Sequence, residues 1–170
     1  LPVRPAGIKP MPSLRGARLI VGSKDFTEQF ILAYIAEFAL AAAGADVRDM
    51  SNITGAMSAR NALVTEQIDM TWDYTGSSWI SYNGREEPIP DPRAQFEAVR
   101  RLDHQRHDIT WIAPSFEVDN TYALSMNKAT AARLGVRTLS DLARLARQRP
   151  EEATFCLDSE LAKRSDGWPG

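Results

Sequence analysis

The sequence has few of the side chains that perform most nucleophilic and metal-assisted catalysis. Its 170 residues include one cysteine and two histidines. A single cysteine cannot form an intramolecular disulfide, and Cys156, in the apolar stretch 153–157, is predicted to be a buried strand residue rather than a nucleophile. His104 and His107 lie three residues apart at a predicted helix end, with no cysteine or third ligand nearby. We therefore expect no catalytic residue, no bound metal and no cofactor.

The sequence also lacks a strong net charge and a hydrophobic run long enough for a membrane span. The formal net charge of −2 is too small to indicate a nucleic-acid surface. The longest apolar stretch, 30–43, is interrupted by Tyr34 and Glu37 and is too short to cross about 30 Å of hydrocarbon. With 44% hydrophobic residues, the chain can form a real core, in one domain or in one domain and part of a second.

Short apolar strands alternate with amphipathic helices after residue 16, which predicts an α/β sheet with crossover helices. Residues 1–16 contain four prolines and are expected to form an extended, loosely held linker. The predicted strands are 18–22, 47–50, 68–72, 109–112, 122–126 and a last strand around Phe155. The predicted helices are a long first helix from Asp25 and four shorter ones, 56–64, 93–106, 129–134 and 139–147.

The first helix carries both a start signal and a stop signal. Asp25 and Glu28 have the spacing of a capping box, and Gly44 is a residue type that ends helices. Apolar residues recur at helical spacing between these signals. They are predicted to form the core-facing side of the helix: Phe30, Ile31, Tyr34, Ile35, Phe38 and Ala42.

Three polar and aromatic stretches, 22–29, 72–76 and 119–122, lie at the ends of predicted strands. Open α/β sheets bind ligands at strand ends, so these stretches indicate one crevice. A quaternary ammonium ion cannot donate a hydrogen bond, so a protein holds it with ring faces and nearby negative charge. Each ring contributes about 0.5–2 kcal/mol. Tyr74 and Tyr122 each follow a polar residue at a strand boundary and fit this need.

Five sequence motifs occur in a fixed order: Gly-Ser-Lys-Asp-Phe-Thr-Glu-Gln at 22–29, Tyr-Thr-Gly at 74–76, Asn-Thr-Tyr-Ala-Leu at 120–124, Leu-Gly-Val-Arg-Thr-Leu-Ser-Asp-Leu at 134–142 and Arg-Ser-Asp-Gly-Trp-Pro-Gly at 164–170. With them the chain resembles the substrate-binding proteins of ABC importers for glycine betaine, choline, carnitine and related compatible solutes, from about Leu19 onward. The resemblance implies a bilobed α/β fold of the type II periplasmic binding protein class, whose two lobes close on the solute about a hinge.

The resemblance also implies roles for individual residues at the predicted crevice. Tyr74 and Tyr122 are similar to two rings of the aromatic cage that surrounds the ammonium group in this family. Asn120, beside Tyr122, is similar to a position that is polar or acidic in relatives and lines the same pocket. These three residues are therefore expected to hold the methylated nitrogen of the solute.

Three further residues are expected to bind the polar end of the solute. Lys24 is similar to a basic residue that meets a ligand carboxylate, helped by the N–H groups of a helix start. Arg164 is expected to add a second contact from the other lobe, since a guanidinium group matches a carboxylate. Thr75 is expected to supply a hydrogen bond.

By the same resemblance, the Pro-rich linker 1–16 is followed by an incomplete lobe one at 17–113, a hinge crossover at 114–121 and part of lobe two at 122–170. Relatives complete the cage with residues beyond this range, so the chain resembles a truncated binding protein. The expected partners are a quaternary ammonium or betaine-type solute and an ABC permease, with no nucleic acid. The expected location is periplasmic or extracytoplasmic, at the membrane through the transporter. An unfinished lobe would expose apolar surface and strand edges, through which copies of the chain could associate.

Other interpretations stay open on the sequence alone. Tyr74 is also compatible with a packed strand-end residue, and Lys24 with a solvated loop lysine. An enzyme on a similar bilobed fold would need Asp73, Lys24 or Glu28 as an acid or base, but no nucleophile–base pair is visible. A ligand-sensing domain of a signalling or regulatory protein would share the same fold, although no helix-turn-helix precedes residue 17.

Overall fold

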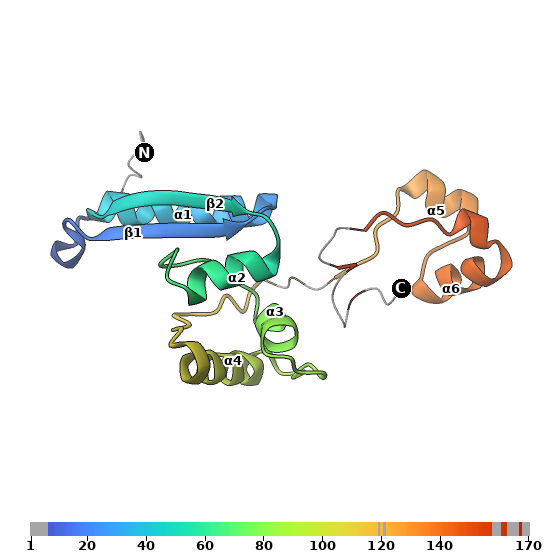
Figure 1. Cartoon of the computed structure of the whole chain (residues 1–170). Coiled ribbons are helices and arrows are strands. Elements are labelled where there is room, and N and C mark those ends of the chain that lie inside the picture. The colour runs from blue at the N-terminus through green and yellow to red at the C-terminus, as the bar shows by residue number, and fades with distance from the viewer. Residues whose placement is uncertain (1–6, 119, 121, 158–160, 163–166, 168–170) are drawn as a thin grey trace.

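The computed structural model describes residues 7–118, 120, 122–157, 161–162 and 167. Figure 1 shows a larger group of elements, which contains the sheet, and a smaller group to its right, which contains the last two helices. In chain order the elements are η1 (Pro12–Leu14), β1 (Arg18–Lys24), α1 (Thr27–Ala43), β2 (Asp46–Ile53), α2 (Ala56–Val64), α3 (Thr75–Ser77), η2 (Ser78–Tyr82), α4 (Pro92–His107), α5 (Lys128–Leu134), α6 (Leu139–Gln148) and η3 (Pro150–Glu152).

The sheet of the described residues is a parallel pair, β1 and β2, connected through α1. The pairing begins with Arg18 opposite Asp46 and ends with Lys24 opposite Ile53. Parallel neighbours need a crossover segment of this kind, which is the α/β alternation that the sequence predicts. Figure 1 shows α1 lying along one face of the pair and α2 near its other side.

The prediction of a third strand at 68–72 is wrong. This segment makes one bridge, between Val21 and Met70, in which the Gly22 N–H donates to the Met70 carbonyl at 2.9 Å. Gly22 is required there, because a Cβ atom would lie 2.4 Å from a methyl carbon of Ile68. Beyond Met70 the chain leaves the sheet, and Asp73 then contacts Lys24 at the end of β1. This course brings residues 73–75 to the last residue of β1.

The start of α1 differs from the predicted capping box. The helix begins at Thr27 after Phe26, and no side chain caps it. Asp25 instead accepts a hydrogen bond from the Gly55 N–H at 3.4 Å, and Glu28 faces residues far along the chain. The predicted stop is confirmed, because Gly44 ends the helix with a φ of 113°, in the left-handed region that glycine adopts readily.

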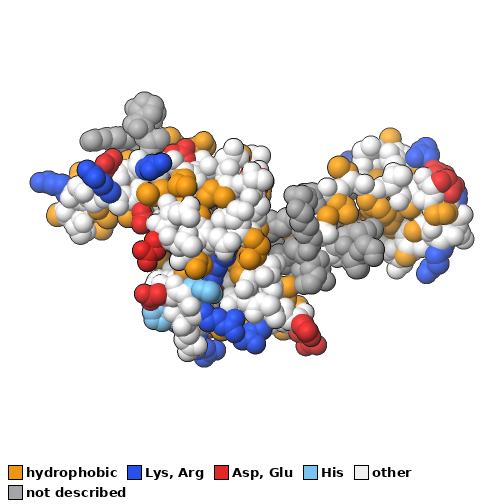
Figure 2. Space-filling model, viewed as in Figure 1, with side chains coloured by type: hydrophobic (Ala, Val, Ile, Leu, Met, Phe, Trp, Pro, Cys, Tyr) orange, Lys and Arg blue, Asp and Glu red, His pale blue; other side chains and the backbone are white. Residues whose placement is uncertain are grey.

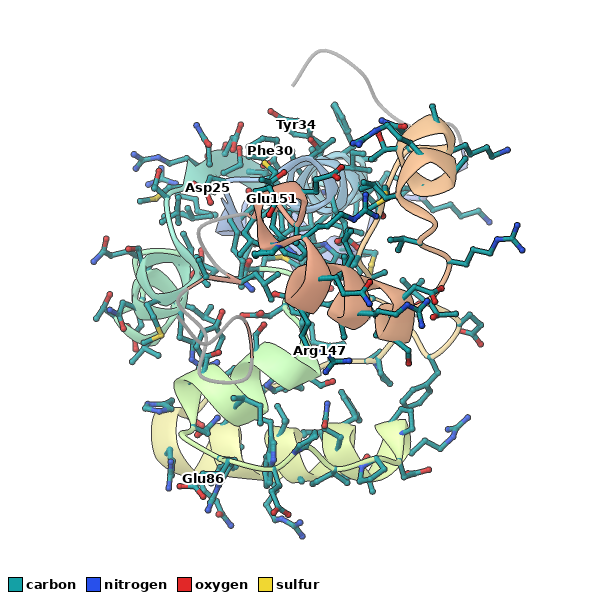
Figure 3. All side chains as sticks on the ribbon, turned by 90° about the vertical axis from the view of Figure 1, so that its right-hand side faces the viewer. Asp25, Phe30, Tyr34, Glu86, Arg147 and Glu151 are labelled. Atoms are coloured by element: carbon teal, nitrogen blue, oxygen red, sulfur yellow. The ribbon has the colours of Figure 1, made fainter. Side chains whose placement is uncertain are left out.

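The predicted core face of α1 is largely wrong. Ala33 and Ala36 are buried with Val21 of β1, whereas Ile31, Tyr34 and Ile35 are 41–55% exposed. Small side chains on one face let the helix backbone approach the sheet closely, so the large side chains point away from it. In Figure 3, Tyr34 lies on the outer side of the molecule. In the described ranges, no helix is long and apolar enough to cross a membrane.

The proline-rich start is held more firmly than the sequence predicts, as far as the structure describes it. Pro12–Leu14 form the short 3₁₀ turn η1. The Met11 N–H donates to the Ala43 carbonyl at 2.8 Å, which ties this segment to the end of α1. Residues 1–6 of the predicted linker lie outside the described residues.

A buried carboxylate on α4 connects α2, η2 and the segment that follows α4. Asp103 is 0% exposed and accepts from both terminal nitrogens of Arg60, at 2.7 and 3.1 Å. Ser78, Asn83 and Trp111 also donate to it, at 2.7–2.9 Å. Burial would raise the pKa of Asp103, but the hydrogen bonds from Arg60, Asn83 and Trp111 outweigh burial and hold that pKa below its usual value. This carboxylate fixes where η2 and α4 lie.

Three other predicted strands are wrong. Residues 109–112, 122–126 and the segment around Phe155 have no strand structure. Ile112 is 85% exposed, and Cys156, predicted to be buried in a strand, is exposed as well. A strand needs a partner for its backbone groups, and the described part of the chain pairs none with these segments.

The later helices agree with their predicted bounds to within one residue. α4 begins at Pro92 after the N-cap Asp91, whose side chain accepts from the Ala94 N–H at 2.7 Å. α6 begins with a capping box between Thr138 and Asp141. These boundaries are predictable because their signals are local. Figure 1 shows α5 and α6 apart from the sheet.

The Arg60–Asp103 pair gives a first prediction. Arg60→Met leaves a buried carboxylate without its cation, so we expect a loss of about 3–5 kcal/mol in the free energy of unfolding, measured by urea denaturation. The control is Arg100→Met, which breaks an exposed pair with Glu97 and should lose less than about 1 kcal/mol. Equal losses for the two variants would contradict the structural role of Asp103.

Glu37 gives a second prediction. Its carboxyl group on α1 is buried, and neither oxygen has a hydrogen-bond partner among the described residues. Burial, and then the negative charge of Asp49, raise the pKa of Glu37 from 4.5 to about 7. The folded protein therefore keeps a proton that the unfolded chain releases. This contribution to stability is complete below pH 4.5 and is lost as the pH rises through about 7.

We expect the urea midpoint of the wild-type protein to fall between about pH 5 and pH 8, and the midpoint of Glu37→Gln to change much less. An exposed carboxylate, removed in Glu66→Gln, serves as the control and should keep the wild-type slope. Parallel curves for the wild type and Glu37→Gln would show that Glu37 does not carry the pH dependence.

Candidate functional site

The candidate site forms where β1 ends and the chain returns from Met70. Lys24, the last residue of β1, is 1% exposed, and its Nζ atom lies 2.7 Å from Asp73 Oδ1. The same oxygen accepts from the Tyr74 N–H at 2.8 Å. A buried ammonium group is stable only when it is paired, so this ion pair fixes the backbone at Tyr74 relative to the end of the strand.

Aromatic rings surround this ammonium group. The Lys24 Nζ atom lies 4.7 Å from the centre of the Tyr74 ring and 5.7 Å from that of Tyr82. Phe26 stacks on Tyr74, with 6.3 Å between ring centres and 14° between ring planes. Both cation distances lie within the range of cation–π attraction. Two tyrosine rings and a carboxylate therefore already hold one positively charged nitrogen.

The hydroxyl group of Tyr74 is fixed by two neighbouring residues of α1. It donates to Glu28 Oε2 at 2.7 Å and accepts from Gln29 Nε2 at 3.1 Å. Burial, and then the hydrogen bond to Glu28, raise the pKa of Tyr74 above its usual value. The tyrosine therefore stays protonated at physiological pH, and its single proton is directed to Glu28.

Asn120 reaches the same carboxylate from the segment that leads to α5. Its Nδ2 atom donates to Glu28 Oε2 at 2.9 Å, across 92 residues of sequence. The hydroxyl of Thr75 accepts from Gln95 Nε2 on α4 at 2.9 Å. The structure thus joins Lys24, Tyr74 and Asn120 in one network, through Asp73 and Glu28, and Thr75 links that network to α4.

The structure leaves the roles of two predicted site residues untested. Tyr122 is 56% exposed, two residues beyond Asn120. Arg164 lies outside the described residues. Their roles in ligand binding stay predictions, and so does the contact between Lys24 and a ligand carboxylate.

Sequence reasoning missed the positions of Asp73, Gln29 and Tyr82 in this network. Asp73 was considered as a candidate acid of an enzyme, and Glu28 as such an acid and as part of a capping box. Gln29 was noted only as the last residue of the motif at 22–29. The available signal for Asp73 was its place directly before Tyr74. Tyr82 gave no signal, because its position near Lys24 depends on the π-helix η2.

A surface hollow of about 450 Å³ lies on α4, away from the ends of the strands. Figure 2 shows Lys and Arg side chains gathered along the lower edge of the molecule, over α4. The hollow is lined by Glu97, Arg100, Arg101, His104, Thr110 and Trp111. Two guanidinium groups repel an onium ion, and the Trp111 N–H is already bonded to Asp103. The network around Tyr74 is therefore the better candidate for such a ligand.

Comparison with known proteins identifies the family of the chain. A family model for the substrate binding domain of the ABC-type glycine betaine transport system matches residues 17–170. A glycine-betaine-binding protein of Pseudomonas aeruginosa is 39% identical over 167 residues, which cover 95% of this chain and 51% of that protein.

Two more distant matches also cover about half of the other protein. CosB, a substrate-binding protein of a chemotactic signal transduction system in Halobacterium salinarum, is 28% identical over 152 residues, which cover 88% of this chain and 45% of CosB. A solved structure of a glycine betaine/carnitine/choline ABC transporter superposes with a TM-score of 0.57 and 20% identity, over 78% of this chain and 49% of that one.

The chain spans about half the length of the curated relatives it matches. The matches confirm the predicted α/β binding-protein fold, incomplete in this chain, and the matched relatives are substrate-binding proteins rather than enzymes. The family model covers all but the first 16 residues. The chain therefore belongs to the family of substrate-binding domains of ABC-type glycine betaine transport systems.

Proposed function

We propose that the protein captures a quaternary ammonium compatible solute, of the glycine betaine, choline and carnitine class, in a cage of tyrosine rings. The observation that carries this proposal is the position of the Lys24 ammonium group, 4.7 Å from the centre of the Tyr74 ring, with a carboxylate beside it. A tyrosine ring that attracts one ammonium group can also attract a quaternary ammonium ion. The carboxylate of Glu28, which accepts from the Tyr74 hydroxyl, adds negative charge beside that ring. The family membership and the glycine-betaine-binding relative support the same solute class.

In this proposal the residues divide into ligand contacts and positioning residues. Tyr74 supplies the first ring, and Tyr122 supplies a second when the two lobes close. Asn120 holds the connecting segment near the site through its 2.9 Å bond to Glu28. Lys24 is a positioning residue, because its ammonium group is already paired with Asp73 and buried. Arg164 is the candidate for a contact from the second lobe.

In this proposal, the protein works outside the cytoplasm and delivers its solute to an ABC permease. The name of the relative CosB favours a second destination for the bound state, a signalling receptor. The two alternatives share the binding step and differ only in the protein that receives the closed form. We also propose that copies of this chain associate through the exposed apolar residues of α1.

The third prediction tests the binding step. Titration of the full-length protein with choline, glycine betaine and carnitine, followed by calorimetry, should show saturable binding of at least one solute with one site per protein. The solute should be recovered unchanged after incubation. Failure of all three to bind would overturn the proposed function, and conversion of a bound solute to a product would favour an enzyme.

The fourth prediction concerns the rings. Tyr74→Ala and Tyr122→Ala should each weaken binding by about 3–30-fold, because each removes one ring face from the cation. Tyr74→Phe and Tyr122→Phe keep the ring face and should stay within about threefold of the wild type. Tyr34→Ala, on the outer side of α1, is the control and should not change the affinity. Equal losses for the Phe and Ala variants would show that the hydroxyl groups, and not the rings, bind the solute.

A further inference from the structure

The candidate site carries one negative charge that no cation of the described residues balances. Lys24 and Asp73 neutralise each other at 2.7 Å. The carboxylate of Glu28 accepts hydrogen bonds only from neutral groups, the Tyr74 hydroxyl and the Asn120 amide. Glu28 forms no ion pair within the described part of the chain. The net charge around Tyr74 is therefore −1, which favours a ligand with a net charge of +1 over a zwitterion.

The site also contains a buried acceptor without a donor. Gln29 is 0% exposed, and its Oε1 atom has no hydrogen-bond partner among the described residues. The orientation of this amide is fixed by its neighbours. The single proton of the Tyr74 hydroxyl goes to Glu28, so that hydroxyl can only accept from Gln29, and the amide must present its nitrogen there.

An unpaired buried acceptor is unfavourable, and a ligand that supplies a donor removes this penalty. The acceptor and the unbalanced carboxylate lie on adjacent residues of α1, at the hydroxyl end of the same tyrosine. A suitable ligand thus combines a positive charge with a hydrogen-bond donor. Glycine betaine offers neither a net charge nor a donor.

We infer that the solute preferred by this site is a hydroxyl-bearing quaternary ammonium monocation of the choline type, selected by Glu28 through its charge and by Gln29 through its amide oxygen. This inference rests on the proposed function and narrows its ligand class. It assigns Glu28 and Gln29 as specificity-determining residues. Lys24, buried and paired with Asp73, leaves no ammonium group in the described network to receive a ligand carboxylate.

Four small ligands separate the two requirements. Choline has a positive charge and a hydroxyl group, and tetramethylammonium has the charge alone. Carnitine has a hydroxyl group but no net charge, and glycine betaine has neither. Calorimetric titration of the full-length protein should give the highest affinity for choline, the lowest for glycine betaine, and about a tenfold gap between the two.

Two variants test the two residues separately. Glu28→Gln keeps an acceptor for Tyr74 and Asn120 but removes the charge, so choline and tetramethylammonium should each weaken about tenfold, while carnitine and glycine betaine change less than about twofold. Gln29→Met keeps the shape and removes the acceptor, so the preference for choline over tetramethylammonium should disappear. The deciding readouts are ratios of affinities within one protein, choline to glycine betaine for Glu28→Gln and choline to tetramethylammonium for Gln29→Met, which a partial loss of folding does not change.

Glu86→Gln provides the matched control, because it removes one exposed carboxylate from a loop. Figure 3 shows Glu86 at the lower edge of the molecule, far from Asp25 and Phe30, which lie on either side of the start of α1. All four affinities should keep their wild-type order in this variant.

The outcomes separate the inference from the function on which it rests. If none of the four ligands binds, the proposed function fails. If glycine betaine or carnitine binds as tightly as choline, the solute class stands and this inference is wrong. The inference is also wrong if Glu28→Gln weakens all four ligands equally.

Discussion

The buried ion pair between Lys24 and Asp73 is the constraint on which the site depends. An ammonium group at the end of β1, with 1% of the side chain exposed, requires a carboxylate within hydrogen-bond distance. Asp73 meets this requirement only because the chain leaves the sheet after Met70 and crosses the end of β1. The same carboxylate oxygen binds the backbone of Tyr74. The ring of Tyr74 is thus placed by electrostatics, and its hydroxyl group is then fixed by Glu28 and Gln29.

A second buried ion pair, Arg60–Asp103, lies near the first. The Tyr82 ring connects the two pairs, because Lys24 Nζ lies 5.7 Å from its centre and Arg60 Cζ lies 5.2 Å from it. Removal of either cation would leave a buried carboxylate unpaired, and that loss is far larger than the net contribution of an intact pair. The elements α2, η2 and α4 therefore cannot shift relative to the end of β1 without breaking one of these contacts. This rigidity suits a site that must present a ring in a fixed position.

The sequence predicted the features that depend on neighbours along the chain. The helices at 56–64, 93–106 and 139–147, the stop at Gly44 and the capping residues of α6 follow from local patterns and agree with the structure. The predictions of strands at 109–112 and 122–126 are wrong, because a strand depends on a partner that is distant in sequence. The predicted buried face of α1 is largely wrong for a related reason. The apolar residues of α1 lie on several of its faces, and only packing against β1 decides that the alanines face the sheet. The three polar stretches were predicted to meet, and the structure does join Lys24, Tyr74 and Asn120 in one network. The pairing of Lys24 with Asp73 was beyond sequence patterns, since 49 residues separate the two.

The proposed function requires that the site bind a foreign cation without losing its own ammonium group, and the chemistry of Lys24 meets this requirement. Lys24 holds Asp73 by donating an N–H bond, whereas a fully methylated nitrogen has no proton to donate. A quaternary ammonium ion therefore cannot replace Lys24 at Asp73. A primary amine could compete for that carboxylate, but it would also need the buried position of Lys24. The methylated ion is restricted to ring faces and to unpaired negative charge, and in the described network that charge lies on Glu28, at the hydroxyl end of Tyr74. In the proposed function, the distinction between an ammonium group that donates and one that cannot thus separates the structural cation from the ligand, with Tyr74 as the shared ring.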